Sequence, residues 1–281
     1  MRIRPGYTLD IVQADLDYAL QKWKNLYSDQ NYLFGRYIQT VTDTHDRLAQ
    51  AIAEPRLAEG LLAGHYWQLV EMRGATELHG ILVLEVQQQI AAIEDAQRQL
   101  KELRAYAGRP GVPVVYDTNM LNHWKQPEDV DWKTLLSGEG LDGKRARLVV
   151  PLVVIDELDR QKYGDGALAR RAATAIRYLE RKLDRAAPGE AVKLREGVTL
   201  EVRLDPPGHR RAEPDLEILR CAADLDGLVP GVGVRVLTDD YGMRLRAQSM
   251  GLATLRLPAA YRKASTGMDT ASHEVPAPAR R

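Results

Sequence analysis

Val112-Pro-Val-Val-Tyr-Asp-Thr-Asn119 is the stretch that decides how this 281-residue chain folds. A short run rich in β-branched residues ends in an aspartate, which is typical of a buried strand that stops at the edge of a sheet. Residues 148–155 and 234–237 form two further apolar runs of this kind, and residues 168–185, 214–226 and 241–250 have helical spacing. Short apolar strands that alternate with helices predict an α/β fold, with a parallel sheet covered on both faces.

The residues before this stretch have a different character. Between residues 7 and 107 proline is nearly absent, and apolar residues recur three and four positions apart. This spacing predicts three or four helices packed as an all-α bundle, with breaks at Glu54-Pro55 and Arg73-Gly74. The aromatic residues at helical spacings are expected in its core; they include Trp23, Tyr27 and Trp67. We expect a structural module or an oligomerising one, which would join copies of the chain into a homo-oligomer.

Changes in composition divide the chain into three parts. Gly108-Arg-Pro-Gly111 concentrates turn-forming residues and is the predicted linker. Residues 192–204 alternate apolar and polar side chains around Glu196-Gly197, which predicts a β-hairpin insert. The residues from Ala264 onward are rich in Ser, Thr, Ala and Pro and show no period. We therefore predict a helical bundle at 1–110, an α/β domain at 111–263 and a disordered tail at 264–281.

Bulk composition excludes several classes of protein. Lys and Arg number 39, as do Asp and Glu, so no global basic field favours nucleic acid. The single cysteine, Cys221, excludes an internal disulfide and suits a reducing compartment. The longest apolar run, 148–155, is far shorter than the roughly 20 residues that span a bilayer. These features predict a cytoplasmic protein without a membrane partner.

Acidic residues follow each predicted strand of the second half. They are Asp117, Glu157 and the pair Asp239-Asp240. Because the carboxyl ends of parallel strands share one edge of a sheet, we expect these side chains to meet. Asp215, at the start of a predicted helix, adds a fourth acidic position. Crowded carboxylates repel one another, so either their pKa values rise or a cation lies among them.

The ligand type indicates which cation this would be. Carboxylate oxygens suit Mg²⁺ or Mn²⁺, whereas the six histidines show no zinc-binding spacing. Each acid also has a purely structural interpretation, because an aspartate after a strand is commonly a helix N-cap and Asp215 suits the helix dipole. Recurrence at three strand ends favours the cluster over three unrelated caps.

In these residues the chain resembles the PIN-domain ribonucleases, and the larger bacterial members in particular. Four motifs occur in the family order: Tyr116-Asp-Thr-Asn-Met-Leu121, Val154-Ile-Asp-Glu-Leu-Asp159, Asp215-Leu-Glu-Ile-Leu219 and Thr238-Asp-Asp-Tyr-Gly-Met-Arg-Leu-Arg246. They span residues 112–262, whereas residues 1–110 carry no resemblance. The resemblance implies a three-layer α/β/α sandwich, dependence on a divalent metal and endonucleolytic cleavage of single-stranded RNA.

The resemblance also implies roles for individual residues. The expected catalytic ligands of Mg²⁺ or Mn²⁺ are Asp117, Glu157, Asp215 and Asp240. Asp239 stands where many members have Asn, so it joins the cluster as a fifth acid or competes with Asp240. Thr118, Asn119 and Thr238 are expected to orient the carboxylates.

Basic residues predict where RNA would bind. Residues 160–185 carry an excess of Lys and Arg directly after the second motif. The candidates are Arg160, Lys162, Arg170, Arg171, Arg210 and Arg211. Such a surface can track a phosphate backbone, and it can equally be the solvated face of a helix.

Two other functions remain as alternatives. The first is a non-catalytic RNA-binding module that keeps the PIN-like fold. The second is another family with aspartates at strand ends, such as a phosphatase or a phosphoacceptor domain. Asn119 disfavours the phosphatase, whose motif requires an aspartate there, and the acidic pair 239–240 comes too late in the chain for a phosphoacceptor domain.

Overall fold

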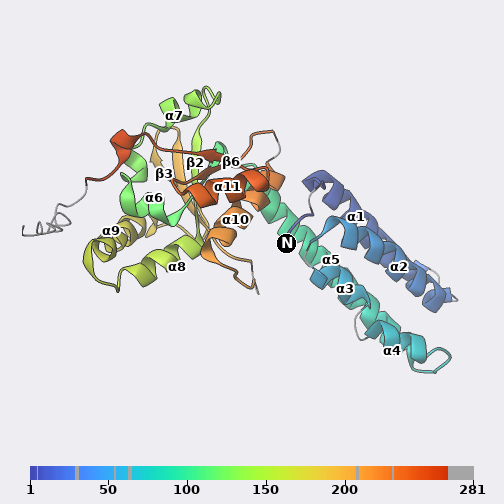
Figure 1. The fold of residues 1–281 in the computed structure, drawn as a ribbon. Helices are drawn as coiled ribbons and strands as arrows, with labels where there is room; N and C mark the ends of the chain where they lie inside the picture. The colour runs from blue at the N-terminus through green and yellow to red at the C-terminus, as the bar shows by residue number, and fades with distance from the viewer. Residues whose placement is uncertain are drawn as a thin grey trace, which may run out of the picture.

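The computed structural model describes residues 1–4, 6–28, 32–53, 55–62, 65–206, 209–229 and 231–264. The predicted disordered tail therefore lies outside the described residues from position 265 onward. A six-stranded α/β domain is joined to a helical bundle, which projects from it as an arm (Figure 1). None of the helices in the described ranges combines the length and the apolar composition that a bilayer crossing requires.

The sheet has the strand order β3-β4-β2-β1-β5-β6, and every neighbouring pair is parallel except β3 with β4. The strands are β1 (Val112–Tyr116), β2 (Ala146–Pro151), β3 (Val192–Arg195), β4 (Val198–Arg203), β5 (Arg235–Leu237) and β6 (Ala253–Leu255). Every residue of β1 and of β2 is buried, which requires cover on both faces of the sheet. The predicted α/β sandwich is thereby confirmed.

Helices that connect the strands supply this cover. They are α6 (Thr118–His123), α7 (Trp132–Gly138), α8 (Leu152–Gln161), α9 (Gly166–Leu183), α10 (Pro214–Leu228) and α11 (Tyr241–Ser249). The predicted helices at 168–185, 214–226 and 241–250 correspond to α9, α10 and α11. Their apolar faces join the strands in one continuous core.

The hairpin predicted at 192–204 is present, and its second strand has a larger role than an insert would have. β3 and β4 turn at Gly197, whose φ is 73°. β4 then pairs in parallel with β2 along the whole of that strand. Val198 and Leu200 are buried as a result, so β4 is an integral strand of the sheet.

The bundle has five helices in its described residues, where the sequence predicted three or four. They are α1 (Leu9–Lys24), α2 (Leu33–Ala51), α3 (Pro55–Leu62), α4 (His65–Glu71) and α5 (Leu78–Ala107). Trp23 is buried as predicted, and its indole N–H donates to Thr44 Oγ1 at 3.2 Å. Trp67 was expected in the core, but it is 60% exposed because α4 is a short helix at the far end of the arm. The side chain of Tyr27 lies outside the described residues.

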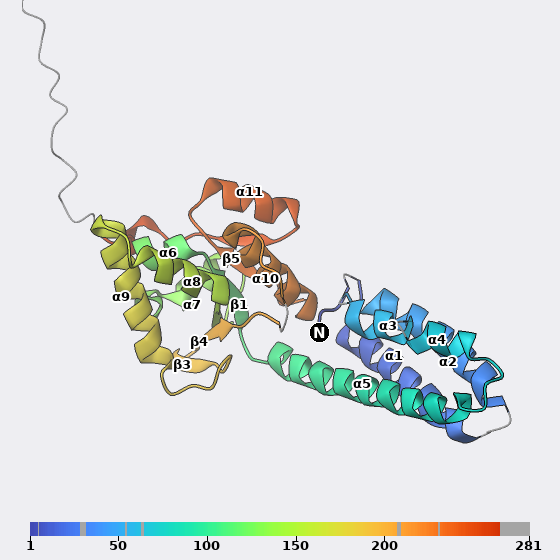
Figure 2. The same cartoon turned by 90° about the horizontal axis from the view of Figure 1, so that it is seen from below.

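The long helix α5 connects the two parts (Figure 2). It ends at Ala107, and the chain enters β1 through Gly111, whose φ is 117° and where a Cβ atom would lie 3.1 Å from the Arg145 carbonyl oxygen. Leu103 and Tyr106, on the last turns of α5, already belong to the core of the α/β domain. At the other end of the bundle's sequence, Arg2 forms a 2.7 Å ion pair with Asp224 on α10. The division at residue 110 and the oligomerising role of the bundle stay predictions.

Candidate metal-binding site and nucleic-acid interface

Asp117 lies at the carboxyl end of β1, between the neighbouring strands β2 and β5. It is the N-cap of α6, and its Oδ1 accepts a 3.3 Å hydrogen bond from the backbone N–H of Asn119. Its own N–H donates to the carbonyl of Leu237, at the end of β5. This pairing brings Thr238 alongside, and the Thr238 hydroxyl donates to Asp117 Oδ2 at 2.7 Å. Thr238 thus contacts Asp117 directly, and its expected role in orienting a metal ligand stays a prediction.

The surroundings of Asp117 disfavour its negative charge. The residue is only 4% exposed, and burial raises the pKa of its carboxyl group from 3.8 to about 6. Hydrogen bonds from Thr238 and Asn119 oppose this rise, whereas the charges of Asp215 and Glu157 add to it. The predicted meeting of these acids in one metal-binding cluster stays a prediction.

Glu157 reaches the site from a helix and not from a strand end. The strand predicted at 148–155 stops at Pro151, which is the N-cap of α8, so Glu157 lies in the second turn of that helix. Proline lacks the N–H that would continue the ladder, and the following residues pack on the sheet through a helical face. Glu157 Oε2 accepts a 2.5 Å hydrogen bond from the hydroxyl of Thr118, in α6.

A second contact between α6 and α8 reinforces the first. The side-chain amide of Asn122 donates to Gln161 Oε1 at 2.7 Å, one helical turn beyond the contact between Thr118 and Glu157. The sequence analysis missed this pair. Its only signal is the shared spacing of four residues, which places each pair on one helical face.

Asp215 occupies the first turn of α10, where an acid suits the helix dipole. Its Oδ2 forms a 2.6 Å ion pair with the guanidinium of Arg246 on α11. Its side chain is about half exposed, so it is free to adopt other rotamers. The sequence analysis did not predict this contact.

The two acids after β5 have different partners. Asp240 is the N-cap of α11, and its Oδ1 accepts from the backbone N–H of Met243 at 2.7 Å. Asp239 accepts from Arg256 at 2.9 Å. The structural interpretation weighed for the strand-end acids applies to Asp117 and Asp240, because both are helix N-caps.

The donor set matches a hard divalent ion in chemistry, although the side chains are not closed around one. Asp117, Glu157 and Asp215 are oxygen donors from three elements, and burial makes the Asp117 charge costly without a cation. In their present rotamers, no three Asp, Glu, His or Cys side chains of the described residues lie close enough to hold a metal. The ion pair with Arg246 is the contact that Asp215 would have to leave.

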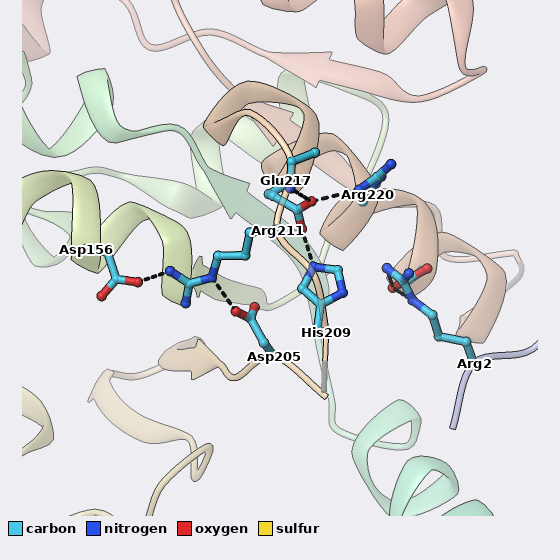
Figure 3. A network of polar contacts seen from close by, with 9 residues as sticks. Arg2, Asp156, Asp205, His209, Arg211, Glu217 and Arg220 are labelled. Atoms are coloured by element: carbon cyan, nitrogen blue, oxygen red, sulfur yellow. Dashed lines mark hydrogen bonds and ion pairs between the residues drawn. The ribbon is translucent and has the colours of Figure 1, made fainter. Parts of the chain in front are cut away.

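The predicted RNA-binding residues fall into two groups. Arg211 is committed to an ion-pair network, since it contacts Asp156 and, at 2.6 Å, Asp205 (Figure 3). Lys162 pairs with Asp159, and Arg171 donates to His123 Nδ1 at 2.8 Å. The second group is exposed and has no ion-pair partner among the described residues; it consists of Arg160, Arg170 and Arg210.

His209 has a structural role that the sequence did not reveal. Its Nε2 lies 2.6 Å from Glu217 Oε2, and Glu217 also receives hydrogen bonds from the Ala212 N–H and from Arg220 (Figure 3). Glu217 is buried in the first turns of α10. This network fixes the segment from 209 to 213 against α10, and through it the position of Asp215.

Comparison with known proteins decides the family. The family model of the PIN domain matches residues 114–257, which is half of the chain and contains every acid described above. The chain belongs to the PIN-domain family. Membership indicates a nuclease-type or RNA-related function, and the bundle lies outside the match.

The remaining comparisons add little to the PIN assignment. Among solved structures, a domain of a functionally unknown protein from Methanocaldococcus jannaschii DSM 2661 is 20% identical. The match covers 56% of this chain and 99% of that one, and its TM-score of 0.33 is too low to support an argument. No curated protein matches the chain.

Proposed function

We propose that this PIN-domain protein is a metal-dependent endoribonuclease that hydrolyses single-stranded RNA at its acidic sheet edge. The observation that supports this best is the environment of Asp117. It is a buried carboxylate, with a pKa raised to about 6, beside the charges of Glu157 and Asp215. Negative charges beside a buried carboxylate destabilise the fold, and a divalent cation would relieve this repulsion.

The carboxylates are held to different degrees. Asp117 is fixed by Thr238 and by the N–H of Asn119, and Glu157 is fixed by Thr118. These contacts restrict the rotamers of both carboxylates, which suits rigid metal ligands. Mg²⁺ or Mn²⁺, when bound there, lowers the pKa of a water molecule and offsets the charge that develops on the phosphate.

Asp215 and Asp240 would complete the set of metal ligands, and Asp215 would first have to change its ion-pair partner. Asp215 would exchange Arg246 for the metal, and both residues are exposed enough for this to cost little. Asp240 uses Oδ1 to cap α11, which leaves Oδ2 for the edge. Asp239 is paired with Arg256, so we assign the fourth position to Asp240 and a peripheral one to Asp239.

RNA would approach along α9. Arg160 and Arg170 are exposed cations without carboxylate partners among the described residues, and both lie close in sequence to the second motif. Unpaired cations attract phosphates without first breaking an ion pair, which favours them over Lys162 and Arg211 as RNA contacts. Arg171 would first have to leave its hydrogen bond to His123.

A paired assay on unstructured RNA tests this proposal. Cleavage is measured in Mn²⁺ and binding in EDTA, for the wild type, Asp117→Asn, Asp240→Asn and Arg170→Ala. Each aspartate variant should lose at least about 100-fold in cleavage and keep its RNA affinity, since these acids act on the reacting phosphate. Arg170→Ala should weaken binding and reduce the log–log salt slope by up to about 0.7.

Arg73→Ala, in an exposed turn of the bundle, is the matched control for charge and should change neither quantity. If Asp117→Asn cleaves RNA at the wild-type rate, Asp117 is not one of the catalytic residues. A wild-type protein that binds RNA and cuts none of several sequences would make the non-catalytic module the better assignment. That alternative has its own support, because Arg246 and Arg256 form ion pairs with Asp215 and Asp239 and so compete with a metal for these two acids.

A further inference from the structure

Three guanidinium groups surround one aromatic ring where the bundle meets the α/β domain. Tyr106 lies on the last turn of α5, and the Cζ atoms of Arg147 and Arg203 are each 4.2 Å from its ring centroid. Arg109, from the linker, lies 4.7 Å from the same centroid. Three cations brought together by β2, β4 and the linker are therefore at most about 9 Å apart, a distance at which like charges repel strongly in a half-buried site.

One carboxylate offsets part of the positive charge of these three guanidinium groups. Glu201 is fully buried in β4 and accepts from Arg147 Nε at 2.9 Å and Nη2 at 2.7 Å. Its other oxygen accepts from Arg109 Nη1 at 2.5 Å. No hydrogen bond or ion pair joins the guanidinium of Arg203 to another residue in the described part of the chain, so these four side chains together carry an excess of about two positive charges. Stacking on Tyr106 offsets this cost only in part.

Donor atoms in the cluster also lack acceptors. Arg147 Nη1 and the Tyr106 hydroxyl are buried without a hydrogen-bond partner, and an unsatisfied buried donor is costly. Arg109 makes its contacts, to Glu201 and to the Gly189 carbonyl, through Nη1 alone. The remaining nitrogens of Arg109 and all those of Arg203 are available to an incoming acceptor.

A cleft opens beside Tyr106, Arg109 and Arg203. It has a volume of about 760 Å³ and lies between α5 and the carboxyl-terminal part of β4. Its lining residues include Tyr106, Arg109 and Arg203, together with Asp95, Gln99 and Glu102, which lie one to three helical turns before Tyr106 on α5. This volume is in the range of pockets that enclose small organic ligands. A ligand that fits both groups of residues carries an anionic group and, some distance away, hydroxyl groups that donate to carboxylate and amide oxygens.

We propose that this cleft binds a 5′-nucleotide, with its phosphate on Arg109 and Arg203 and its ribose hydroxyls toward Gln99 and Glu102. Planar guanidinium forks bind phosphate oxygens in pairs, and a dianionic phosphate monoester would supply the two missing negative charges. The ligand is either a free mononucleotide or the 5′-phosphorylated end of an RNA chain. The cleft is separate from the acidic edge, so the proposal does not rest on metal binding or on cleavage.

Calorimetric titration of the full-length protein in EDTA tests the site, with 5′-AMP and adenosine as ligands. We expect AMP to bind at least about tenfold more tightly than adenosine, because charge-assisted hydrogen bonds to the phosphate dominate. Arg203→Gln should reduce the AMP affinity at least about tenfold. Arg203→Lys keeps the charge without the fork and should fall between the two. Arg185→Gln, which removes an exposed charge beyond α9, should bind AMP as the wild type does.

Two RNA oligonucleotides of one sequence, with a 5′-phosphate or a 5′-hydroxyl, identify the source of the phosphate. Tighter binding of the phosphorylated form by the wild type, lost in Arg203→Gln, identifies an RNA end; AMP binding without that preference identifies a free nucleotide. Equal binding of AMP and adenosine, absence of AMP binding, or AMP affinity in Arg203→Gln equal to that in Arg185→Gln overturns the proposal. If Arg203→Gln does not fold, wild-type AMP affinity in Arg203→Lys overturns it.

Discussion

The backbone around Asp117 favours the charged form of its side chain, whereas the electrostatics of the sheet edge disfavour it. As an N-cap of α6 the carboxylate accepts from the Asn119 N–H, which favours its charged form. Burial and the neighbouring acids disfavour that form by more, because the net result is a pKa of about 6. A residue whose charge destabilises its own fold is typical of a functional site.

This conflict predicts that Asp117→Asn stabilises the metal-free protein at pH 7. The folded-state pKa is raised from 3.8 to about 6, so the folded protein binds the proton more tightly than the unfolded chain does. The resulting destabilisation is absent below about pH 4, grows as the pH rises and is complete above about pH 6. A shift of this size corresponds to about 3 kcal/mol at most. Asparagine can still cap α6, but its amide nitrogen cannot accept the hydrogen bond from Thr238, which reduces the expected gain to about 1–2 kcal/mol.

Urea unfolding of both proteins in EDTA between pH 4 and pH 7 measures this difference. Other titrating groups are common to the two proteins, so the difference isolates Asp117. The advantage of Asp117→Asn should shrink as the pH falls. A variant that is less stable than the wild type at pH 7, or a difference that does not change with pH, would contradict the assignment.

At the scale of elements, the contact between α10 and α11 controls the outer part of the site. Arg246 of α11 holds Asp215 of α10, and Arg256, after β6, holds Asp239. These arginines neutralise acids that would otherwise face Asp117 and Glu157. A divalent cation would therefore have to compete with the guanidinium of Arg246 for Asp215.

Arg246→Gln should consequently tighten Mn²⁺ binding. An exposed ion pair contributes up to about 1 kcal/mol, so the gain in affinity should be at most about fivefold. Isothermal titration with Mn²⁺ measures it, and Arg177→Gln, on the exposed face of α9, controls for the loss of a positive charge. Unchanged or weaker Mn²⁺ binding in Arg246→Gln would show that Asp215 does not ligate the metal.

At the scale of the whole molecule, two hydrophobic cores meet along the end of α5. One core belongs to the bundle, and the other contains the sheet together with Leu103 and Tyr106 of α5. The predicted boundary at residue 110 lies three residues after the end of α5 at Ala107. Because Leu103 and Tyr106 pack in the core of the α/β domain, we propose a folding boundary about two turns before residue 110.

A segment of residues 101–264 should therefore unfold cooperatively and be more stable than a segment of residues 112–264. The shorter one loses the buried side chains of Leu103 and Tyr106, each of which contributes about 2–5 kcal/mol in comparable core sites. Thermal melts of both segments test this. Equal melting temperatures would place the boundary at 110, and a non-cooperative melt of 101–264 would contradict the independence of the α/β domain.

Local pattern was sufficient for the family and for many of the elements, although it did not predict β6, α6 or α7. Strands such as Val112–Tyr116 are short and β-branched, helices such as α9 and α10 have clear periodicity, and the four motifs contain every acid of the proposed site. These features depend on residues close in sequence, where side-chain spacing and propensity determine the outcome. Pro151 shows the limit, since an apolar run across it was predicted as one strand and is a strand followed by a helix.

Only the tertiary structure decided which partner each charged side chain has. The pairs Arg246 with Asp215, Glu157 with Thr118 and Glu201 with Arg147 join residues 31 to 54 positions apart. The cluster of arginines on Tyr106 likewise requires β2, β4 and the end of α5 to meet. Charge acts over a few ångströms of space and carries no periodicity along the chain, so its balance at a site follows from packing and cannot be derived from spacing alone.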